Sequence, residues 1–543
     1  MTAIVRSAGC DRNGQAKLLK FDGIQIKKWL KKGLLAAVII EAVYLVLFNL
    51  ALNIPLTQTL VNKIKPDKFH AYWDHAWTWY PFRVHANKVS VNGQSRSQQW
   101  QVEVKQASAS IALLPLILRK VKLYDMQGSN LEYFQRPRLK PHKDYTLTRD
   151  FFPPIRDRQI NQANLQKKKQ RKPWIITLDN INVNGKHTLW IYQVHAALQG
   201  DLHADLSIQT QSGPFSLTHG NADVKLDSLL INGNPAVTKQ GYLKGTVDIG
   251  PVIFKQNRGI KSLAFITVDT EIRADVDNLS FLNLYLDKFH GMKAAGFGYL
   301  AGRFRFDKGI LLPQTDLQVD ADKLSLTLLE HRIEGDGTID LNVKKTRPDE
   351  LNVKIQFADL DALHMQDMQP LFMGHNVSVE ARGKPSVFPS GDRKSDISLL
   401  GISIPSVKVT DLGVYQRYLP DKWQLKLIAG EGELRGKAEL TANAFHADLK
   451  LISEDAELGI AEHRFKTNLD SGLFINSPSL KSASMDISGS YLRLNDSSLS
   501  TKLHGNSRTW ETALMIDKGV LKLHLPKVPD QDSELDQLSA ALD

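Results

Sequence analysis

From Val84 almost to its end, the chain alternates apolar and polar residues with a period of two. The pattern is clear in 100–105 (WQVEVK), 351–357 (LNVKIQF) and 445–451 (FHADLKL). A period of two places successive side chains on opposite faces of a β-strand, so each strand has one apolar and one polar face. Such strands belong to antiparallel sheets with a solvated side, because parallel strands buried on both faces are continuously apolar. The pattern predicts a mainly β fold.

Few segments after the first 52 residues depart from this alternation. Three candidate helices are 56–65, 111–118 and 359–373. The predicted fold is therefore an elongated, curled, antiparallel-rich β-sheet with a groove-like apolar side and few helices. About 25 strands at roughly 4.7 Å each would form a sheet about 120 Å long.

The alternation changes phase inside one segment. Leu317 and Val319 occupy odd positions, whereas Leu324 and Leu326 occupy even ones. A shift by one residue transfers every following side chain to the other face of a strand. We therefore predict a turn or a β-bulge at Asp322–Lys323.

A glycine motif, Gly-x-Leu-x-Gly, occurs at 241–245, 298–302 and 432–436 and precedes predicted strands. A dinucleotide-binding loop needs glycines at positions one, three and six at the start of a helix, and this motif has neither feature. Glycine in a strand pattern usually marks a bulge, a bend or a close approach of two backbones. The motif predicts a loosely repeated β architecture.

One apolar segment, 33–52, has the length of a membrane-spanning helix. Its twenty residues include one charged residue, Glu41, and would form a helix of about 30 Å, the thickness of the hydrocarbon core. The preceding residues 1–32 contain eight Lys or Arg and two Asp, which is about half of the formal net charge of +11. By the positive-inside rule, residues 1–32 are cytoplasmic and the bulk of the chain lies across the membrane. A cleaved signal peptide is the alternative, although the apolar stretch has full length and no Ala-x-Ala site follows.

Two polar residues, Glu41 and Asn49, lie within this segment. An ionised acid near the middle of a membrane costs about 2.5–3.5 kcal/mol on insertion scales. Glu41 either contacts a partner helix in the membrane or is a protonated acid that a very apolar helix tolerates. Both interpretations stay open.

The segment that follows, 53–83, is rich in aromatic residues. Seven of them lie between Phe69 and Phe82. Indole and phenol rings favour the membrane interface, but they also close the ends of hydrophobic cores, so the cluster is either an interfacial belt or a cap. The exported part has no cysteine, which suits a bacterial periplasm better than a disulfide-rich extracellular protein.

Two charged segments lack the alternation. The basic loop 155–173 reads as a solvated surface that could contact anionic headgroups, and the tail 530–543 is acidic. The predicted organisation is a cytoplasmic basic tail (1–32), a transmembrane helix (33–52), a juxtamembrane aromatic segment (53–83), an N-terminal β module (84–154), the basic loop (155–173), a repetitive β-sheet region (174–529) and the acidic tail (530–543).

The motifs of common enzyme classes are missing from the sequence. There is no His-Glu-x-x-His pair, no nucleophile elbow, no phosphate-binding Lys loop and no calcium loop, and the only cysteine is Cys10. We predict a protein that is not an enzyme and uses no metal or cofactor. The basic excess is concentrated next to the apolar segment, so it indicates membrane topology and no nucleic-acid partner.

The segment Trp100–Arg138, WQVEVKQASASIALLPLILRKVKLYDMQGSNLEYFQRPR, resembles the N-terminal module of the AsmA family: a strand, a Ser-Ile-x-Leu-Leu-Pro-Leu turn, a basic pair and further strands. The Gly-Leu strands of 296–343 resemble the wider AsmA-like group, which includes TamB and YhdP. The resemblance implies a bacterial inner-membrane protein with a single-pass anchor, facing the periplasm. It also implies a curled sheet around an apolar groove, and phospholipid transport for outer-membrane biogenesis or maintenance.

The expected partners are phospholipid acyl chains and the membrane. Eight groove candidates share the apolar positions of two predicted strands. They are Leu317, Val319, Leu324, Leu326, Leu351, Val353, Ile355 and Phe357. The alternative function is a non-enzymatic scaffold or assembly factor for envelope proteins, built from closed β-sandwich domains in which the apolar faces cover each other.

Overall fold

The computed structural model of the chain describes residues 23–522 apart from short internal segments. The segments left out are 65–68, 96–97, 140–145, 147–148, 156–171, 212, 240, 258, 284–292, 329–330, 366–367, 387–396, 419–424, 442–443, 461–462, 478–483 and 500–508. Most of the basic tail 1–32, most of the basic loop 155–173 and all of the acidic tail 530–543 therefore lie outside the described residues.

The described chain begins with a long helix, α1 (Gly23–Asn53), of 31 residues. Its stretch Trp29–Asn53 has a mean hydropathy of 2.3 and is the one described helix long and apolar enough to cross a membrane. It fits a single-pass anchor. A second helix, α2 (Pro55–Ile64), starts at a proline. Proline suits a first helical position, because the N–H at that position has no acceptor within the helix and proline has no N–H to leave unpaired. The predicted helix at 56–65 is confirmed.

The rest of the described chain is mainly β, and its 26 strands form one sheet. The main strands are β3 (Arg83–Gln94), β4 (Gln98–Ala112), β5 (Lys120–Pro137), β6 (Ile175–Ile191), β7 (Val194–Gln209), β8 (Phe215–Ile231), β10 (Gly241–Val252), β11 (Ile266–Val276), β12 (Lys293–Asp307), β14 (Asp316–Leu328), β15 (His331–Lys344), β16 (Glu350–His364), β17 (Pro370–Gly383), β18 (Ile397–Val409), β20 (Gly432–Thr441), β21 (Phe445–Ile460), β22 (His463–Ser477), β24 (Tyr491–Leu499) and β25 (Trp510–Met515). Shorter strands flank them: β1 (Phe69–Tyr72), β2 (His75–Trp77), β9 (Asn234–Val237), β13 (Ile310–Leu311), β19 (Leu425–Ala429), β23 (Ser484–Asp486) and β26 (Val520–Lys522).

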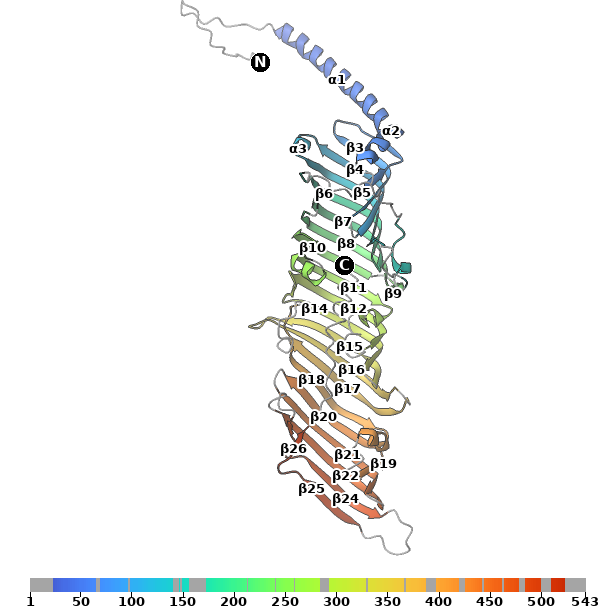
Figure 1. Ribbon diagram of the computed structural model, residues 1–543, viewed down its shortest axis with the longest axis vertical. Coiled ribbons are helices and arrows are strands. Elements are labelled where there is room, and N and C mark those ends of the chain that lie inside the picture. The colour runs from blue at the N-terminus through green and yellow to red at the C-terminus, as the bar shows by residue number, and fades with distance from the viewer. Residues whose placement is uncertain are drawn as a thin grey trace, which may run out of the picture.

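Successive strands lie side by side, so the sheet extends as a long ladder from the α1 end to β25 (Figure 1). Among the described strands, every pairing is antiparallel except that of β5 with β6, where Lys120 lies opposite Ile175 in parallel. About 20 strands follow one another along the axis, which at roughly 4.8 Å per strand gives about 90 Å. The described strands form an open, curled sheet and not the closed sandwiches of the alternative interpretation.

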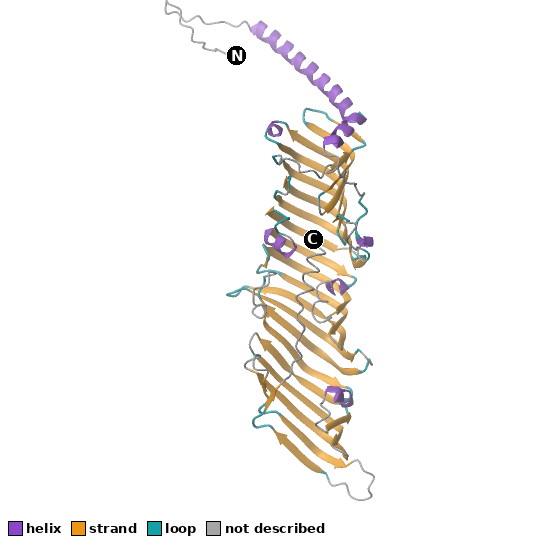
Figure 2. Cartoon of the chain, in the orientation of Figure 1, coloured by secondary structure: helices purple, strands orange, loops and turns teal. Residues whose placement is uncertain are grey.

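Within the described residues, helices are few and lie at the ends or edges of the sheet (Figure 2). The shorter ones are α3 (Leu114–Ile117), η1 (Arg149–Phe151), η3 (Gly259–Phe265), η4 (Leu279–Leu282) and η6 (Leu412–Tyr418). The predicted helix at 111–118 is confirmed only as the single turn α3. The predicted helix at 359–373 is wrong, because Leu360 and Ala362 are buried while Asp359 and Asp361 are exposed, which is the period of a strand.

The predicted irregularity at Asp322–Lys323 is a β-bulge inside the continuous strand β14. The register of β14 on β15 shifts between Ala321 and Leu324, and Lys323 adopts a positive φ of 49°. The bulge leaves the Lys323 N–H outside the ladder, and this N–H donates to Asp336 Oδ1 on β15 at 2.9 Å. The bulge restores Leu324 to the face that carries Ala321.

A bulge whose N–H donates to a side-chain oxygen of the neighbouring strand occurs at two further places in the described sheet. The N–H of Asn180, with a φ of 53°, donates to Asp205 Oδ1 at 2.6 Å, and the N–H of Asp455 donates to Asn468 Oδ1 at 3.3 Å. Register shifts accompany both positions. A bulge bends its strand and increases the local twist, so bulges on several strands help to curl the sheet.

The last glycine of each Gly-x-Leu-x-Gly motif faces a backbone carbonyl of the next strand. A Cβ at Gly245, Gly302 or Gly436 would lie 2.3, 2.0 or 2.1 Å from the carbonyl oxygen of an aspartate in that strand. Such distances are far below van der Waals contact, so a side chain at any of these positions would force the backbone of the next strand to shift. Of the three alternatives (a bulge, a bend or a close approach of two backbones), close approach is the one found at these glycines, and the motifs lie within strands and not before them.

We expect Gly302→Ala to lower the thermal unfolding midpoint of the full-length protein in detergent, followed by circular dichroism. The new methyl group would displace the Asp316 carbonyl, and the φ of 142° is one that alanine rarely adopts. Strain of this kind costs about 1–3 kcal/mol. Gly401→Ala is the matched control, because the nearest atom to its Cβ lies 3.8 Å away. Equal midpoints for the two variants would contradict this explanation.

Buried apolar residues gather on one face of the sheet. The largest cluster joins strands β11 to β18 and includes Leu324 and Phe357, which are 0% and 1% exposed. Leu279 of η4 belongs to this cluster, and Tyr415 of η6 packs against it. These short helices therefore cover part of the apolar face from the edge of the sheet.

Candidate functional site

The strand register aligns apolar side chains in a row along the sheet. Residues directly opposite each other on paired strands point to the same face. The row, here called the central row, runs through Leu198, Leu226, Gly241, Ala274, Leu300, Val319, Ile339, Ile355, Val379, Ile402, Ala438, Ala447 and Ile475. No charged residue interrupts it from β7 to β22. We call the face that carries it the apolar face.

A second row of the apolar face lies beside the central row. It consists of Val224, Leu243, Ile272, Gly302, Leu317, Leu341, Val353, Ala381, Leu400, Leu440 and Phe445. Most of its side chains are half-buried, and Leu400 is 42% exposed. Among the described residues, the side chains of this row are therefore only partly covered and remain accessible from outside the sheet.

The eight groove candidates all lie on β14 and β16 and share the apolar face. Leu324 and Phe357 are fully buried, so the protein itself already covers them. Val319, Leu326 and Ile355 pack against the same cluster and are partly buried. Leu317, Leu351 and Val353 are half-buried and lie outside the buried cluster. These last three are the candidates best placed to contact a bound chain.

The candidates represent a small part of the face. The rows continue through Val379, Ile402 and Ala438 at one end and Leu226 and Leu243 at the other. The alternation of apolar and polar residues, as in 445–451, shows which residues of one strand share a face. Strand order and register were needed to show that the apolar positions of different strands form continuous rows.

The apolar face continues toward α1. Tyr133 on β5 lies opposite Val102 on one side and Leu189 on the other, and its hydroxyl donates to Gln135 Oε1 at 2.7 Å. Burial raises the pKa of Tyr133 to about 12.

One histidine, His187, lies next to Leu198 at this end of the central row and is buried. Its Nδ1 accepts from the N–H of Leu131 at 3.2 Å, and its Nε2 lies 3.0 Å from the carbonyl oxygen of Gly200. Both ring nitrogens are satisfied by backbone groups. His187 therefore has a structural role at the irregular junction of β5 and β6.

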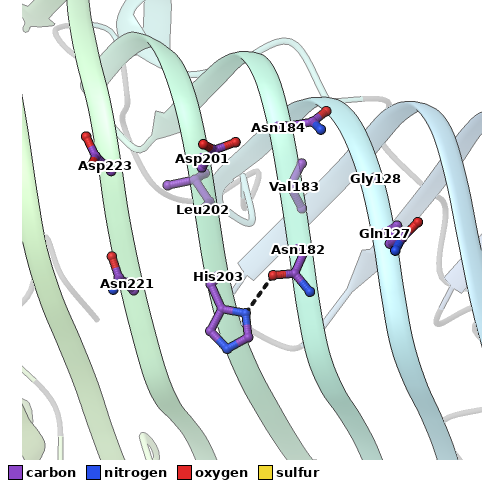
Figure 3. A pocket seen from close by; sticks show the side chains of 10 residues that line it. All are labelled: Gln127, Gly128, Asn182, Val183, Asn184, Asp201, Leu202, His203, Asn221 and Asp223. Atoms are coloured by element: carbon purple, nitrogen blue, oxygen red, sulfur yellow. Dashed lines mark hydrogen bonds between the residues drawn. The ribbon is translucent and has the colours of Figure 1, made fainter.

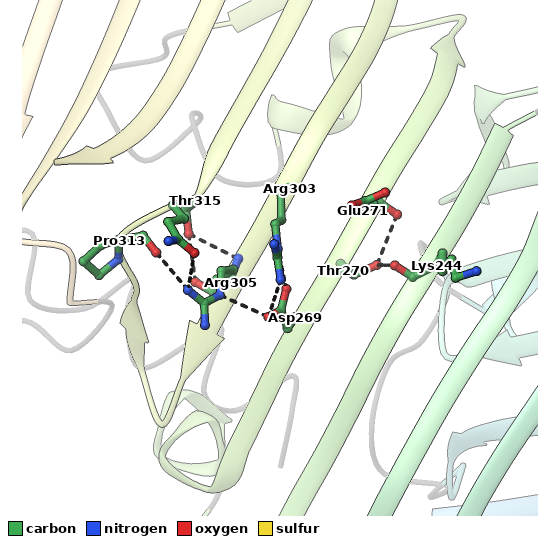
Figure 4. Close-up of polar contacts among 9 residues, drawn as sticks. Lys244, Asp269, Thr270, Glu271, Arg303, Arg305, Pro313 and Thr315 are labelled. Carbon is green, nitrogen blue, oxygen red and sulfur yellow. Dashed lines mark hydrogen bonds and ion pairs between the residues drawn. The ribbon is translucent and has the colours of Figure 1, made fainter. Parts of the chain in front are cut away.

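The opposite face of the sheet is polar and carries cross-strand ion pairs (Figure 4). Asp269 accepts from Arg303 Nε at 2.8 Å and from Arg305 Nε at 3.1 Å. The hydrogen bonds and positive charges of these two arginines lower the pKa of Asp269, and Arg382 lowers the pKa of Glu380 in the same way. This stabilisation is present above the unfolded pKa and is lost as the pH falls through the lower folded pKa.

A cavity of about 480 Å³ opens among β5, β6, β7 and β8 (Figure 3). Seven of its ten lining residues have polar side chains, and His203 Nδ1 lies 2.9 Å from Asn182 Oδ1. Asp223, also in the lining, pairs with Lys244 Nζ at 2.8 Å, and this pair lowers the pKa of Asp223. Its carboxylate is thus ionised near neutral pH and is poorly suited to donate a proton. The cavity suits water or a small polar solute better than an acyl chain.

Among the described residues, no group of three or more His, Cys, Asp or Glu side chains could hold a metal ion. Glu41 is exposed on α1, and the described contacts give it no partner of its own. Its two interpretations therefore stay open.

The junction between α1 and the sheet is built from side-chain amides. Asn53 Nδ2 donates to the carbonyl of Ala76 at 2.7 Å, and its Oδ1 accepts from the Ala76 N–H at 3.1 Å. Asn49 makes the same two bonds with Thr78, at 3.0 and 2.8 Å. Each amide thus replaces a backbone partner at the sheet edge. Sequence reasoning singled out Asn49 only as polar and did not find this role; the four-residue spacing to Asn53 was the available indication.

The ladder of amides continues along α2. Asn62 pairs with both backbone groups of Ala71 at 2.8 and 3.1 Å, and Gln58 Nε2 donates to the carbonyl of Trp73 at 2.7 Å. The Trp73 indole N–H donates to the carbonyl of Leu52 at 2.9 Å. The helices and the first sheet edge are therefore one hydrogen-bonded unit.

We expect Asn53→Ala to speed amide exchange of Ala76 about tenfold in the full-length protein. Without the Asn53 amide, the buried Ala76 N–H and carbonyl lose their partners, which costs about 1–3 kcal/mol. Hydrogen–deuterium exchange measured by mass spectrometry reports this change in the β2 peptide. Thr59→Ala is the control, because Thr59 bonds only within α2. Unchanged exchange in β2 would show that the junction does not depend on this amide.

Comparison with protein-family models, with curated proteins and with solved structures finds no match for this chain. The resemblance to the AsmA family therefore rests on the residues of 100–138 and 296–343 and on the order of the parts.

Proposed function

We propose that this protein is a membrane-anchored, non-enzymatic phospholipid carrier of the bacterial periplasm. Acyl chains would lie along the apolar face, and the role would be biogenesis or maintenance of the outer membrane. The observation that supports this proposal best is the central row, which is apolar over more than a dozen consecutive strands of an open sheet.

Burial energetics support an acyl occupant. An acyl chain gains about 0.8 kcal/mol for each methylene removed from water. Two adjacent apolar rows offer a hydrocarbon surface of this kind without a requirement for a specific polar contact. A charged headgroup would stay in water beside the edge of the sheet, because its burial would be costly.

The topology proposed from sequence agrees with this role. Lys31 and Lys32 lie at the N-terminal end of the apolar stretch of α1, and the positive-inside rule favours a cytoplasmic position for that end. The sheet then belongs to the periplasm. A sheet of about 90 Å supplies a path along part of the envelope, so an acceptor or partner would complete the path.

The scaffold alternative depends on closed β-sandwiches. The described strands form an open sheet with a half-exposed apolar row, so no observation favours that alternative.

We expect a photoreactive phenylalanine analogue at Val353 to capture phospholipid in living cells. Val353 is half-buried in the second row, outside the buried cluster. The same analogue at Lys354, the next residue and on the opposite face, should capture little lipid. Mass spectrometry of the crosslinked protein identifies the adducts. Capture of protein neighbours alone at Val353 would count against the proposal.

We also expect Val353→Glu to reduce the amount of phospholipid that co-purifies with the full-length protein by several-fold. A carboxylate in the row is costly to desolvate against acyl chains. Gln356→Glu adds the same charge to the polar face of the same strand and should leave lipid binding unchanged. Native mass spectrometry measures bound lipid in both. Equal lipid in the two variants would reject the apolar face as the binding surface.

A further inference from the structure

The end of the sheet next to α1 carries two exposed apolar segments. The first is the aromatic loop 79–82 between β2 and β3, where Trp79, Tyr80 and Phe82 are exposed. The second is the α3 segment, 113–118 (LLPLIL), in which Leu114 and Ile117 are both 80% exposed. Exposed apolar side chains in such density are unusual on a water-facing surface.

The two segments belong to one surface. The N–H of Ile111, at the end of β4, donates to the carbonyl of Phe82 at 2.8 Å. Figure 1 shows α3 at the same end of the sheet as α1 and α2. The aromatic loop and the start of the α3 segment are therefore neighbours at the end of the sheet that carries the anchor.

Contacts with α1 fix the depth of this surface relative to the bilayer that α1 would cross. The N–H of Phe82 donates to the Tyr44 hydroxyl at 3.3 Å, and Thr78 is paired with Asn49. Tyr44 precedes the end of α1 by about nine residues, or roughly 13 Å of helix. When α1 crosses a bilayer, the loop therefore lies at the level of the acyl chains and not in the water above them.

The α3 segment satisfies part of its own backbone, which favours contact with hydrocarbon. The N–H groups of Leu116 and Leu118 donate to the carbonyls of Leu113 and Pro115 at 3.0 Å, and Pro115 has no N–H. A satisfied backbone is a condition for contact with the acyl layer. Arg119 and Lys120 follow directly and are exposed, where they could meet anionic headgroups.

We propose that loop 79–82 and the α3 segment form a second membrane contact, inserted into the leaflet from which the C-terminal end of α1 emerges. The first strands of the apolar face then open into the acyl layer, with Val104 of β4 and Leu131 of β5 among the first side chains an acyl chain meets. This inference rests on the proposed function, for which it names the place where lipid reaches the sheet.

Depth-dependent fluorescence quenching in the full-length protein tests the contact. After Cys10→Ser, the variants Ile117→Cys, Leu47→Cys in α1 and Leu514→Cys in β25 are labelled with an environment-sensitive fluorophore. Each is reconstituted into phosphatidylethanolamine–phosphatidylglycerol vesicles that contain lipids with a nitroxide on the acyl chain. All three positions are exposed, so the labels should not disturb the fold. We expect quenching at Ile117 close to that at Leu47 and several-fold stronger than at Leu514.

Quenching at Ile117 no stronger than at Leu514, with strong quenching at Leu47, would overturn the inference. Absence of quenching at both Ile117 and Leu47 would overturn it together with the membrane anchor.

A second measurement separates this inference from the proposed function. Leu114→Asp with Ile117→Asp should reduce lipid capture at Val353 several-fold, whereas Leu514→Asp with Met515→Asp at the far end should not. Undiminished capture in the α3 variant would overturn the inference and leave the proposed function standing. Strong quenching at Ile117, combined with no lipid capture by the analogue at Val353 when the α3 segment is unchanged, would support the membrane contact and reject the proposed function.

Discussion

Strand register is the constraint on which the rest of this structure depends. Because directly paired residues share a face, a period of two in each strand becomes a continuous apolar surface only when neighbouring strands are aligned in phase. Val319, Ile339 and Ile355 illustrate this alignment on three successive strands. A slip of one residue in one pairing would place charged side chains such as Asp340 in the path of the row.

The bulges and glycines maintain this phase while they curl the sheet. At Lys323 the bulge adds a residue, and Asp336 accepts the N–H that the ladder no longer uses. Gly302 and Gly436 allow the strands to approach more closely than any Cβ would permit. The polar face, with pairs such as Arg303–Asp269, keeps the other side in water, although exposed ion pairs contribute little stability individually. The sheet therefore curls without closing, and its apolar rows stay on one face.

The anchor is joined to the sheet by hydrogen bonds and not only by a linker. Asn49 and Asn53 act toward Thr78 and Ala76 as a neighbouring strand would, so the free edge at β2 is covered. An edge held in this way keeps a defined position relative to α1. A defined position is what a protein needs if its apolar face is to begin at the membrane surface.

The sequence by itself determined the β class, the single apolar helix, an irregularity near Lys323 and glycines at special backbone positions. Each follows from local physics: side-chain alternation, hydrophobic length, a phase change, or a missing Cβ. It misassigned 359–373 as a helix, because Leu360 and Leu363 are also spaced as on one face of a helix, and only pairing with the neighbouring strands excludes that interpretation. Tertiary structure alone decided which groove candidates are covered, since Phe357 and Val353 share a face but differ in how many neighbours pack over them. It also decided the role of Asn49 and the joining of loop 79–82 to α3, because both depend on contacts between segments distant in the chain.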